Sequence, residues 1–210
     1  MNAFDRLTAT LKGNKRDIDR LPAMSSVGTY TLDSMEAFDA HWPDAHRNPE
    51  KMARLAAGLS MLAGLDNITV PFDLTLEAEA FGAPVDFFEG RVKWPTVTGF
   101  IADDASDLRI PGDLLSAGRI PTVLKALGIL REEYGGEIPV IAYVNAPFTS
   151  ISSYLVDSIS FLKWLRRSPE TVHEFCGATL DTYVEIANLY EEAGADVITL
   201  HEMGASTDII

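Results

Sequence analysis

The 210-residue sequence has little cysteine, little positive charge and no long apolar run. Its one cysteine, Cys176, excludes an intrachain disulfide and suits a reducing cytoplasm. The 17 Lys and Arg against 31 Asp and Glu give a net charge of −14, which argues against binding to nucleic acid or an anionic membrane, because both need a basic surplus. No window of about 18 residues is apolar enough to span a bilayer, and residues 1–6 do not resemble a signal peptide. We therefore expect a globular cytoplasmic protein.

The sequence also lacks the short motifs of common nucleotide, metal and nucleophile sites. Residues 25–30 read SSVGTY, which is neither G-x-G-x-x-G nor a P-loop. No C-x-x-C, H-E-x-x-H or G-x-S-x-G is present. The sequence therefore holds no complete catalytic constellation that a motif alone reveals.

What the sequence does contain is an alternation of apolar strands and amphipathic helices. Asn48-Pro49-Glu50 has the residues of a helix start, and Gly64 is placed to end that helix. The patterns predict helices over 4–11, 49–63, 74–81, 121–134, 154–166 and 169–193, and strands over 21–27, 67–70, 138–144 and 196–200. The aromatic stretch 83–100 predicts a small hairpin with its turn at Glu89-Gly90.

This alternation predicts an α/β fold with a parallel sheet. The two parallel architectures are an open doubly wound sheet and a closed (βα)₈ TIM-type barrel. Because no glycine-rich turn follows the first predicted strand, the barrel is favoured, and four βα units are half of one. We expect residues 1–20 to be an N-terminal helical extension and residues 21–210 to be the N-terminal half of a barrel.

Three carboxylates follow the strand predicted over 67–70, at the end where barrel enzymes place catalytic groups. Asp73 suits either an active site or the cap of the next helix. Glu77 and Glu79 are two positions apart on that helix and point in different directions, so at most one of them faces a given site.

Polar side chains follow the next two strands in the same way. Asn145 comes after the strand at 138–144, where it suits either ligand binding or a strand-end hydrogen bond. His201 and Glu202 come directly after the strand at 196–200, and such a pair is costly to bury unless it is solvated or used. By contrast, His41 and His46 are expected to pack in a loop, and Cys176 falls on the apolar stripe of a helix.

Several stretches together resemble one family, although each is weak alone. Residues 42–46 (WPDAH) with 48–52 (NPEKM) are similar to the "WP-A-H-NPE-M" stretch of the methylcobamide:coenzyme M methyltransferases, which belong to the uroporphyrinogen-decarboxylase-like superfamily. Further matches are PFDLT with EAEAFG at 71–82, PTVTG at 95–99, GRIP at 118–121 and AGAD at 193–196.

This resemblance implies a (βα)₈ barrel that moves a methyl group from a methylated corrinoid, carried on a partner protein, to a thiol such as coenzyme M or to tetrahydrofolate. It places Asp73, Glu79 and Glu202 at the barrel mouth as catalytic candidates, with His201 and Asn145 as substrate-binding candidates. The family's zinc ligands, a His-x-Cys pair and a distant Cys, have no counterpart in this chain. Zinc is therefore expected only where a C-terminal half is present.

Two other functions stay open at this point. A decarboxylase or lyase could use the same scaffold, but residues 23–28 (AMSSVG) lack the arginines of the "RQAGR" stretch that binds propionates in uroporphyrinogen decarboxylases. A half-barrel without activity could instead bind a corrinoid protein or a partner chain. Because a half-barrel exposes strand edges, we expect either association with a second copy or a missing C-terminal half.

Overall fold

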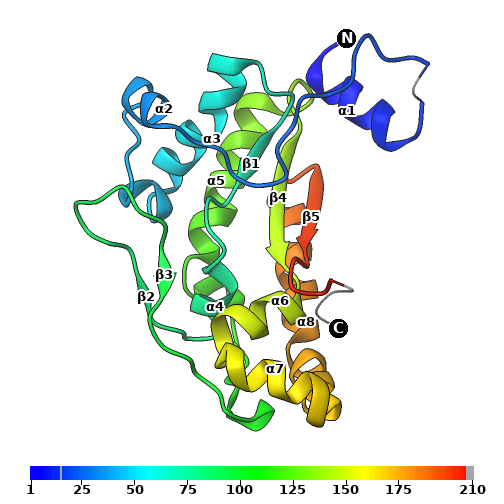
Figure 1. Ribbon diagram of the computed structural model, residues 1–210. Coiled ribbons are helices and arrows are strands. Elements are labelled where there is room, and N and C mark those ends of the chain that lie inside the picture. Colours follow the sequence, from blue (N-terminus) through cyan, green and yellow to red (C-terminus); the bar gives the residue numbers. More distant parts are fainter. Residues whose placement is uncertain (15, 207–210) are drawn as a thin grey trace.

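The structure is a computed structural model that describes residues 1–14 and 16–206 (Figure 1). Its helices are α1 (Ala3–Leu11), α2 (Leu32–Ala37), α3 (Pro49–Ala63), α4 (Leu76–Ala80), α5 (Ile120–Tyr134), α6 (Pro147–Ser150), α7 (Ser158–Arg167) and α8 (Pro169–Glu192). Its strands are β1 (Ile68–Val70), β2 (Val85–Asp86), β3 (Thr96–Val97), β4 (Val140–Asn145) and β5 (Val197–His201). The short turns are η1 (Asp44–His46), η2 (Ala105–Asp107), η3 (Leu114–Ser116) and the π-helical η4 (Ile151–Leu155).

Three strands form a parallel sheet in the order β1-β4-β5, and β2 and β3 form a separate antiparallel hairpin. The register pairs Val70 with Ala142 and Asn145 with His201, so β4 and β5 end at the same level. The predicted hairpin in the aromatic stretch is confirmed, with Val85 opposite Val97.

The core lies between this sheet and the helices α3, α5 and α8. Val140, Ala142 and Val144 of β4 belong to that core, whereas the alternating residues Ile141 and Tyr143 point to the other face. The predicted helix 49–63 is confirmed, because the Asn48 side chain accepts a hydrogen bond from the Lys51 N–H and Gly64 ends the helix in the left-handed conformation. Cys176 of α8 is half-buried against the core.

The strand predicted over residues 21–27 is wrong. This segment runs across the sheet face opposite α5 and α8, in front of the strands in Figure 1. The Ser25 carbonyl accepts hydrogen bonds from the side chains of Asn67 and of Thr69 in β1, and the Ser26 carbonyl accepts one from Thr199 of β5. The Ala23 carbonyl accepts a backbone hydrogen bond from the Asp66 N–H. Apolar spacing could not show that mostly side chains, and not a neighbouring strand, would bind this segment.

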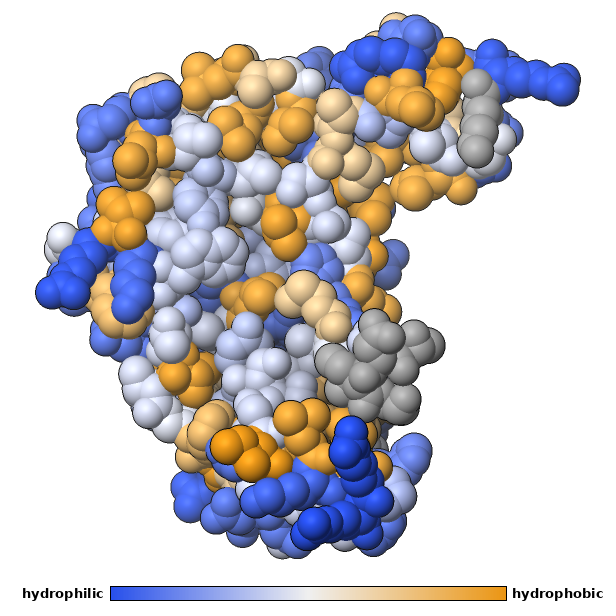
Figure 2. Space-filling view, in the orientation of Figure 1, coloured by the Kyte–Doolittle hydropathy of each residue, from blue (hydrophilic) through white to orange (hydrophobic). Residues whose placement is uncertain are grey.

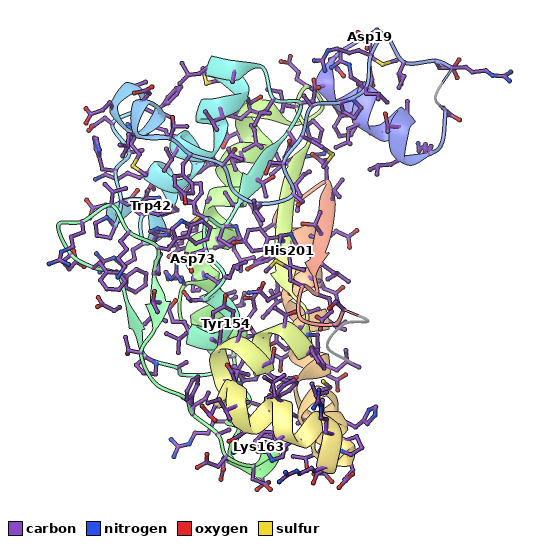
Figure 3. The ribbon with its side chains drawn as sticks, in the orientation of Figure 1. Asp19, Trp42, Asp73, Tyr154, Lys163 and His201 are labelled. Atoms are coloured by element: carbon purple, nitrogen blue, oxygen red, sulfur yellow. The ribbon has the colours of Figure 1, made fainter. Side chains whose placement is uncertain are left out.

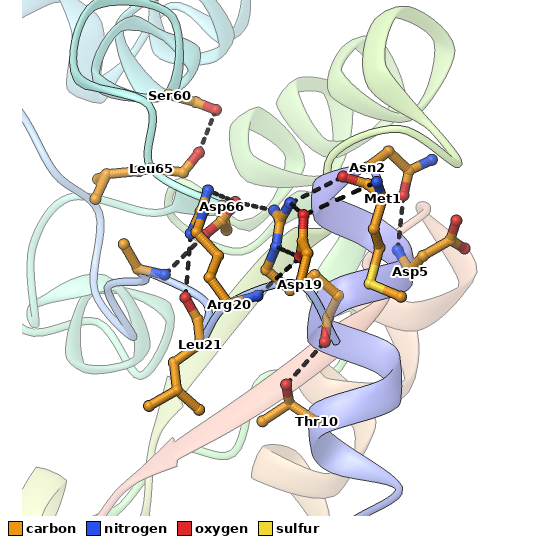
Figure 4. A network of polar contacts seen from close by, with 12 residues as sticks. Met1, Asn2, Asp5, Thr10, Asp19, Arg20, Leu21, Ser60, Leu65 and Asp66 are labelled. Atoms are coloured by element: carbon orange, nitrogen blue, oxygen red, sulfur yellow. Dashed lines mark hydrogen bonds and ion pairs between the residues drawn. The ribbon is translucent and has the colours of Figure 1, made fainter. Parts of the chain in front are cut away.

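A cluster of two arginines and two aspartates holds the start of this crossing segment (Figure 4). Both the Arg6 and the Arg20 guanidinium contact Asp66, at 2.6 and 2.5 Å, and Arg6 also contacts Asp19 at 2.8 Å. Asp66 accepts a further hydrogen bond from the Ala23 N–H. Because Asp66 lies two residues before the start of β1, this network joins α1 and the crossing segment to the sheet.

The helix predicted over 154–166 begins later than expected. Asp157 accepts a hydrogen bond from the Ser160 N–H and starts α7, while the extended Val156 separates α7 from the π-helical η4. Phe161 of α7 is buried, and Trp164 stacks on Phe175 of α8 with the ring centroids 5.4 Å apart. The polar run 149–153 therefore lies in α6 and η4, between β4 and α7.

Exposed apolar side chains are scattered over the surface and do not form one continuous face in Figure 2. In the part of the chain that the structure describes, no helix is long and apolar enough to cross a membrane.

Candidate functional site at the carboxyl ends of the strands

The first polar cluster surrounds Asp73, just after β1. Arg119 binds its carboxylate with two hydrogen bonds, at 2.7 and 3.1 Å, and Thr75 donates to it from both its N–H and its hydroxyl. The Tyr143 hydroxyl donates to the Asp73 carbonyl at 2.6 Å. Glu79 binds the other edge of the same guanidinium at 2.6 Å, so Arg119 joins the two carboxylates.

Asp73 is fully buried, and its charge is compensated locally. Burial alone would raise the pKa of Asp73, but the positive charge of Arg119 and the hydrogen bonds from His46 and Arg119 hold that pKa well below its usual range. Arg119 is likewise buried and stays charged between its two carboxylates. This carboxylate is therefore ionised, fully bonded and closed to solvent.

His46 lies beside Asp73 in an aromatic cluster that includes Trp42; Figure 3 labels Asp73 and Trp42. Its Nδ1 is 3.0 Å from an Asp73 oxygen, and its ring lies 4.3 Å from Trp42 and 5.9 Å from Phe72. Burial lowers the pKa of His46, so the ring is neutral near pH 7. Within residues 1–14 and 16–206, Nε2 has no hydrogen-bond partner, and the Nδ1 contact with Asp73 does not have hydrogen-bond geometry.

A second cluster pairs Glu77 of α4 with Asn145 at the end of β4. The Glu77 carboxylate accepts hydrogen bonds from the Asn145 backbone N–H at 3.0 Å and from its amide at 3.1 Å. The same amide donates to the Leu74 carbonyl at 2.7 Å, so Asn145 joins α4 and the loop before it to β4. Burial raises the pKa of Glu77 to about 7, so this carboxyl titrates near neutrality.

His201 ends β5 and stacks on Tyr143, with ring centroids 4.7 Å apart (Figure 3 shows its place over the sheet). Its Nε2 lies 3.2 Å from the Ser26 carbonyl. Because a carbonyl only accepts, Nε2 carries the proton and Nδ1 is left as an acceptor. Burial lowers the pKa of His201, which favours this neutral form.

Glu202 follows His201 and contacts α6. One of its oxygens accepts a hydrogen bond from the Thr149 N–H at 3.0 Å, and the other has no partner within the described residues. Burial raises the pKa of the Glu202 carboxyl, although the residue keeps part of its surface exposed. The oxygen without a partner is itself buried, so this carboxylate carries one unsatisfied acceptor within the described residues.

A pocket of about 440 Å³ opens beside these two residues. Its walls come from the crossing segment, the loop after β1, the hairpin and the end of β5, and its lining residues are Ser26, Val27, Leu74, Trp94, Leu200, His201, Glu202 and Met203. A concave, mostly apolar pocket with a few polar groups at the carboxyl end of parallel strands is where such folds bind ligands.

The predicted site residues thus fall into three groups. His201 and Glu202 line the pocket, Asn145 is buried next to Glu77, and Asp73 and Glu79 bind Arg119 away from the pocket lining. The sequence reasoning singled out Glu79, whereas Glu77 is the buried glutamate. It also missed Arg119, whose signal was present in the Gly118-Arg119-Ile120-Pro121 match.

No group of three His, Cys, Asp or Glu among residues 1–14 and 16–206 is arranged to hold a metal ion. Burial raises the pKa of the Cys176 thiol, and a protonated thiol is a poor zinc ligand. These residues do not fit a zinc site.

The family model of uroporphyrinogen decarboxylase (URO-D) matches residues 2–210. The chain belongs to the URO-D family. Within it, the chain is 34% identical over 206 residues to the methylcobamide:CoM methyltransferase MtaA of Methanosarcina barkeri, covering 98% of this chain and 60% of that protein. It is 26% identical over 196 residues to the uroporphyrinogen decarboxylase of Trichlorobacter lovleyi, covering 89% of this chain and 56% of that protein.

A solved structure, a methyltransferase from Methanosarcina mazei, matches with a TM-score of 0.90 and 35% identity, covering 100% of this chain and 61% of that one. The predicted α/β class with a parallel sheet is therefore confirmed, and the arrangement is that of part of a (βα)₈ barrel. The resemblance to the methyltransferase branch is confirmed as well. The chain spans about three fifths of the length of these methyltransferases.

Proposed function

We propose that this URO-D family protein takes part in corrinoid-dependent methyl transfer, from a methylated corrinoid on a partner protein to a thiol such as coenzyme M. The proposal rests on the difference in sequence identity between this chain and the two branches of the family. Identity to the methylcobamide:CoM methyltransferase of M. barkeri is 34% over 98% of the chain, against 26% over 89% for the decarboxylase of T. lovleyi. Tetrahydrofolate is the alternative methyl acceptor in this proposal. The proposed location of the protein is the cytoplasm.

The reaction is a displacement at the methyl carbon. The electron pair of the thiolate forms the new S–C bond, and the pair of the broken Co–C bond stays on cobalt, which leaves as cob(I)amide. The thiol must lose its proton first, so a nearby acceptor helps the step.

The residues of this chain can support that reaction at the pocket. His201 presents an acceptor nitrogen because the Ser26 carbonyl fixes the proton on Nε2. Glu202 keeps one oxygen unpartnered within the described residues. We assign to these two the positioning of the acceptor and the removal of its proton. Asn145 and Glu77 together fix the neighbouring loop, while Asp73 and Glu79 with Arg119 hold the wall of the barrel in place.

Uroporphyrinogen decarboxylation is less well supported by the site. Four propionates need several cations, and among the residues that the structure describes no Lys or Arg lines the pocket. Arg119 is buried and already binds Asp73 and Glu79. The charge of this pocket therefore opposes a polyanionic substrate.

The test is a methyl-transfer assay on the 210-residue chain with methylcobalamin and coenzyme M, run with and without Zn²⁺. The expected result is a loss of methylcobalamin absorbance that depends on the protein and on the thiol. Parallel reactions contain tetrahydrofolate or uroporphyrinogen III. Turnover of uroporphyrinogen without methyl transfer would overturn the proposal.

A further inference from the structure

Several buried polar atoms beside the central strand β4 have no hydrogen-bond partner within the described residues. They are the hydroxyls of Ser150, Tyr183 and Tyr190 and the Oδ1 atom of Asn145, and each of these residues is at most 4% exposed. Buried polar groups in folded proteins are almost always bonded to protein or to ordered water, because an unpaired one costs free energy. Four such atoms in one region indicate a partner that is not a protein group.

These atoms belong to elements that pack against one another inside the fold. Asn145 ends β4, Ser150 lies in α6 directly after it, and α8 contacts both α6 and β4. Tyr183 and Tyr190 are about two turns apart on α8, so they point to the same side of that helix. Burial raises the pKa of Tyr183 and the Ser150 hydroxyl lowers it, so these two hydroxyls are neighbours. Because β4 lies between β1 and β5, the region is away from the edges of the sheet.

Glu77 places a buried carboxyl beside the same region. It is 1% exposed and accepts hydrogen bonds from the Asn145 N–H and amide. Unlike Asp73, it has no ion pair with an Arg, Lys or His in the described part of the chain. After burial, the charge of Glu77 is the largest cause that raises the pKa of Tyr190, so this hydroxyl lies within its field. Burial raises the pKa of Glu77 itself to about 7, so part of the molecules carry a proton there near neutral pH.

The other titratable groups around Glu77 are used elsewhere or are not bonded to it. Asp73 and Arg119 bind each other, and the Tyr143 hydroxyl donates to the Asp73 carbonyl. Tyr154 of η4 is only partly buried, and its pKa is raised by burial and then by the charge of Glu77. Within the described residues, none of these side chains forms a hydrogen bond with the Glu77 carboxylate. A proton on Glu77 therefore has no direct protein acceptor among them.

Water meets these requirements because it both donates and accepts hydrogen bonds. A buried water molecule makes about three hydrogen bonds, and a hydroxyl can donate one and accept others. We propose that the region between α6, α8 and the end of β4 is a binding site for water, which bridges the three hydroxyls to the Glu77 carboxyl and lets this carboxyl exchange its proton in the folded protein. The inference goes beyond the proposed function, because it concerns the folded chain without any substrate.

The first experiment removes one hydroxyl at a time and measures thermal stability. Phe has the shape of Tyr without its hydroxyl, so Tyr183→Phe and Tyr190→Phe lose the hydrogen bonds to water and should each lower the melting temperature by about 2–4 °C. Tyr134→Phe is the control and should change it little, because the Tyr134 hydroxyl is exposed and lies 3.7 Å from the Met61 sulfur. A melting temperature that stays the same or rises in Tyr183→Phe and Tyr190→Phe would show that their hydroxyls have no partner, and would overturn the water site.

The second experiment follows the proton of Glu77 by infrared spectroscopy. At about pH 6, below the Glu77 pKa, the protonated carboxyl should give a C=O band that Glu77→Gln removes. Glu174→Gln, at an exposed glutamate of α8, should keep the band. After transfer into D₂O, the band should shift at least about tenfold faster than the amides of β4 exchange, because bound water carries deuterium to Glu77 whereas those amides exchange only when the sheet opens.

Two infrared results would overturn the inference. If no band depends on Glu77, this carboxyl holds no proton, and if the band shifts only as fast as the β4 amides exchange, no water reaches it in the folded protein. Neither measurement involves methyl transfer. The proposed function can therefore fail while this inference stands, and the reverse also holds.

Discussion

Asp73 and Glu202 both follow a parallel strand, yet the structure treats their carboxylates in opposite ways. Asp73 is fully buried and receives hydrogen bonds from Arg119 and Thr75, whereas Glu202 lines a pocket and keeps one oxygen without a partner in the described part of the chain. A buried ion pair that already makes all its hydrogen bonds supports the surrounding structure, but it has no free hydrogen-bonding group for a substrate. The comparison therefore separates a carboxylate that supports the site from one that can act in it.

Removing Arg119 should cause the largest loss of unfolding free energy. In Arg119→Ala, Asp73 stays buried without its cation, and the expected loss of unfolding free energy is about 3–5 kcal/mol. Urea denaturation followed by circular dichroism measures it. The control is Arg109→Ala, which removes an exposed arginine. A loss below about 1 kcal/mol, the range of a surface pair, would contradict the assignment of this pair as the anchor of the site.

Glu77 is expected to give the next largest effect, which is a pH dependence of the free energy of unfolding. Its pKa rises from 4.5 to about 7 in the folded chain, so the folded state binds the proton more tightly than the unfolded state. The stability this contributes is present below pH 4.5 and is lost as the pH rises toward 7, by up to about 3 kcal/mol.

Denaturation of the unchanged chain and of Glu77→Gln, repeated between pH 4.5 and 7, isolates this contribution as the difference between the two. Glu174→Gln, at an exposed carboxylate on α8, controls for the loss of one charge. Equal pH dependence in Glu77→Gln and the unchanged chain would show that folding does not raise the pKa of Glu77.

A substitution at Gly28, just after the crossing segment, should cause a smaller loss of unfolding free energy. A Cβ at residue 28 would lie 2.2 Å from the Pro71 carbonyl oxygen, so Gly28→Ala must push the segment away from the loop after β1. The expected loss is about 1–3 kcal/mol, as for overpacking in a core. Gly112→Ala is the matched control, because its Cβ would meet no atom within 4 Å. Equal thermal stability of the two variants would mean that the segment does not pack tightly here.

Glu202→Gln should have the smallest effect on stability and a clear one on activity. Because Glu202 is partly exposed and has one hydrogen bond within the described residues, the unfolding free energy should change by less than about 1 kcal/mol. The rate of methyl transfer from methylcobalamin should fall by at least about tenfold if this carboxylate handles the thiol proton. An unchanged rate would assign Glu202 to the structural group with Asp73.

Much of the local structure could be read from the sequence because its signals are local. The start of α3 at Asn48-Pro49 and its end at Gly64, the hairpin in the aromatic stretch and the strands β1, β4 and β5 all follow from patterns within a few residues. The family resemblance rested on motifs of the same kind. The path of residues 21–27 did not follow from these signals, because its partners, among them Asn67 and Thr199, are distant in sequence.

The order of strands and polar residues along the chain predicts that carboxylates, an amide and a histidine gather at the carboxyl ends of parallel strands. The charge and exposure of these groups depend on contacts that the fold makes between distant residues. Arg119, 46 residues from Asp73, closes one carboxylate by pairing, and Asn145, 68 residues from Glu77, holds another in a buried place where its pKa rises. Glu202 lines a pocket left by the crossing segment and the hairpin, and one of its oxygens is buried without a partner in the described residues. Charge and solvation depend on which groups come within a few ångströms, and spacing along the chain does not fix that.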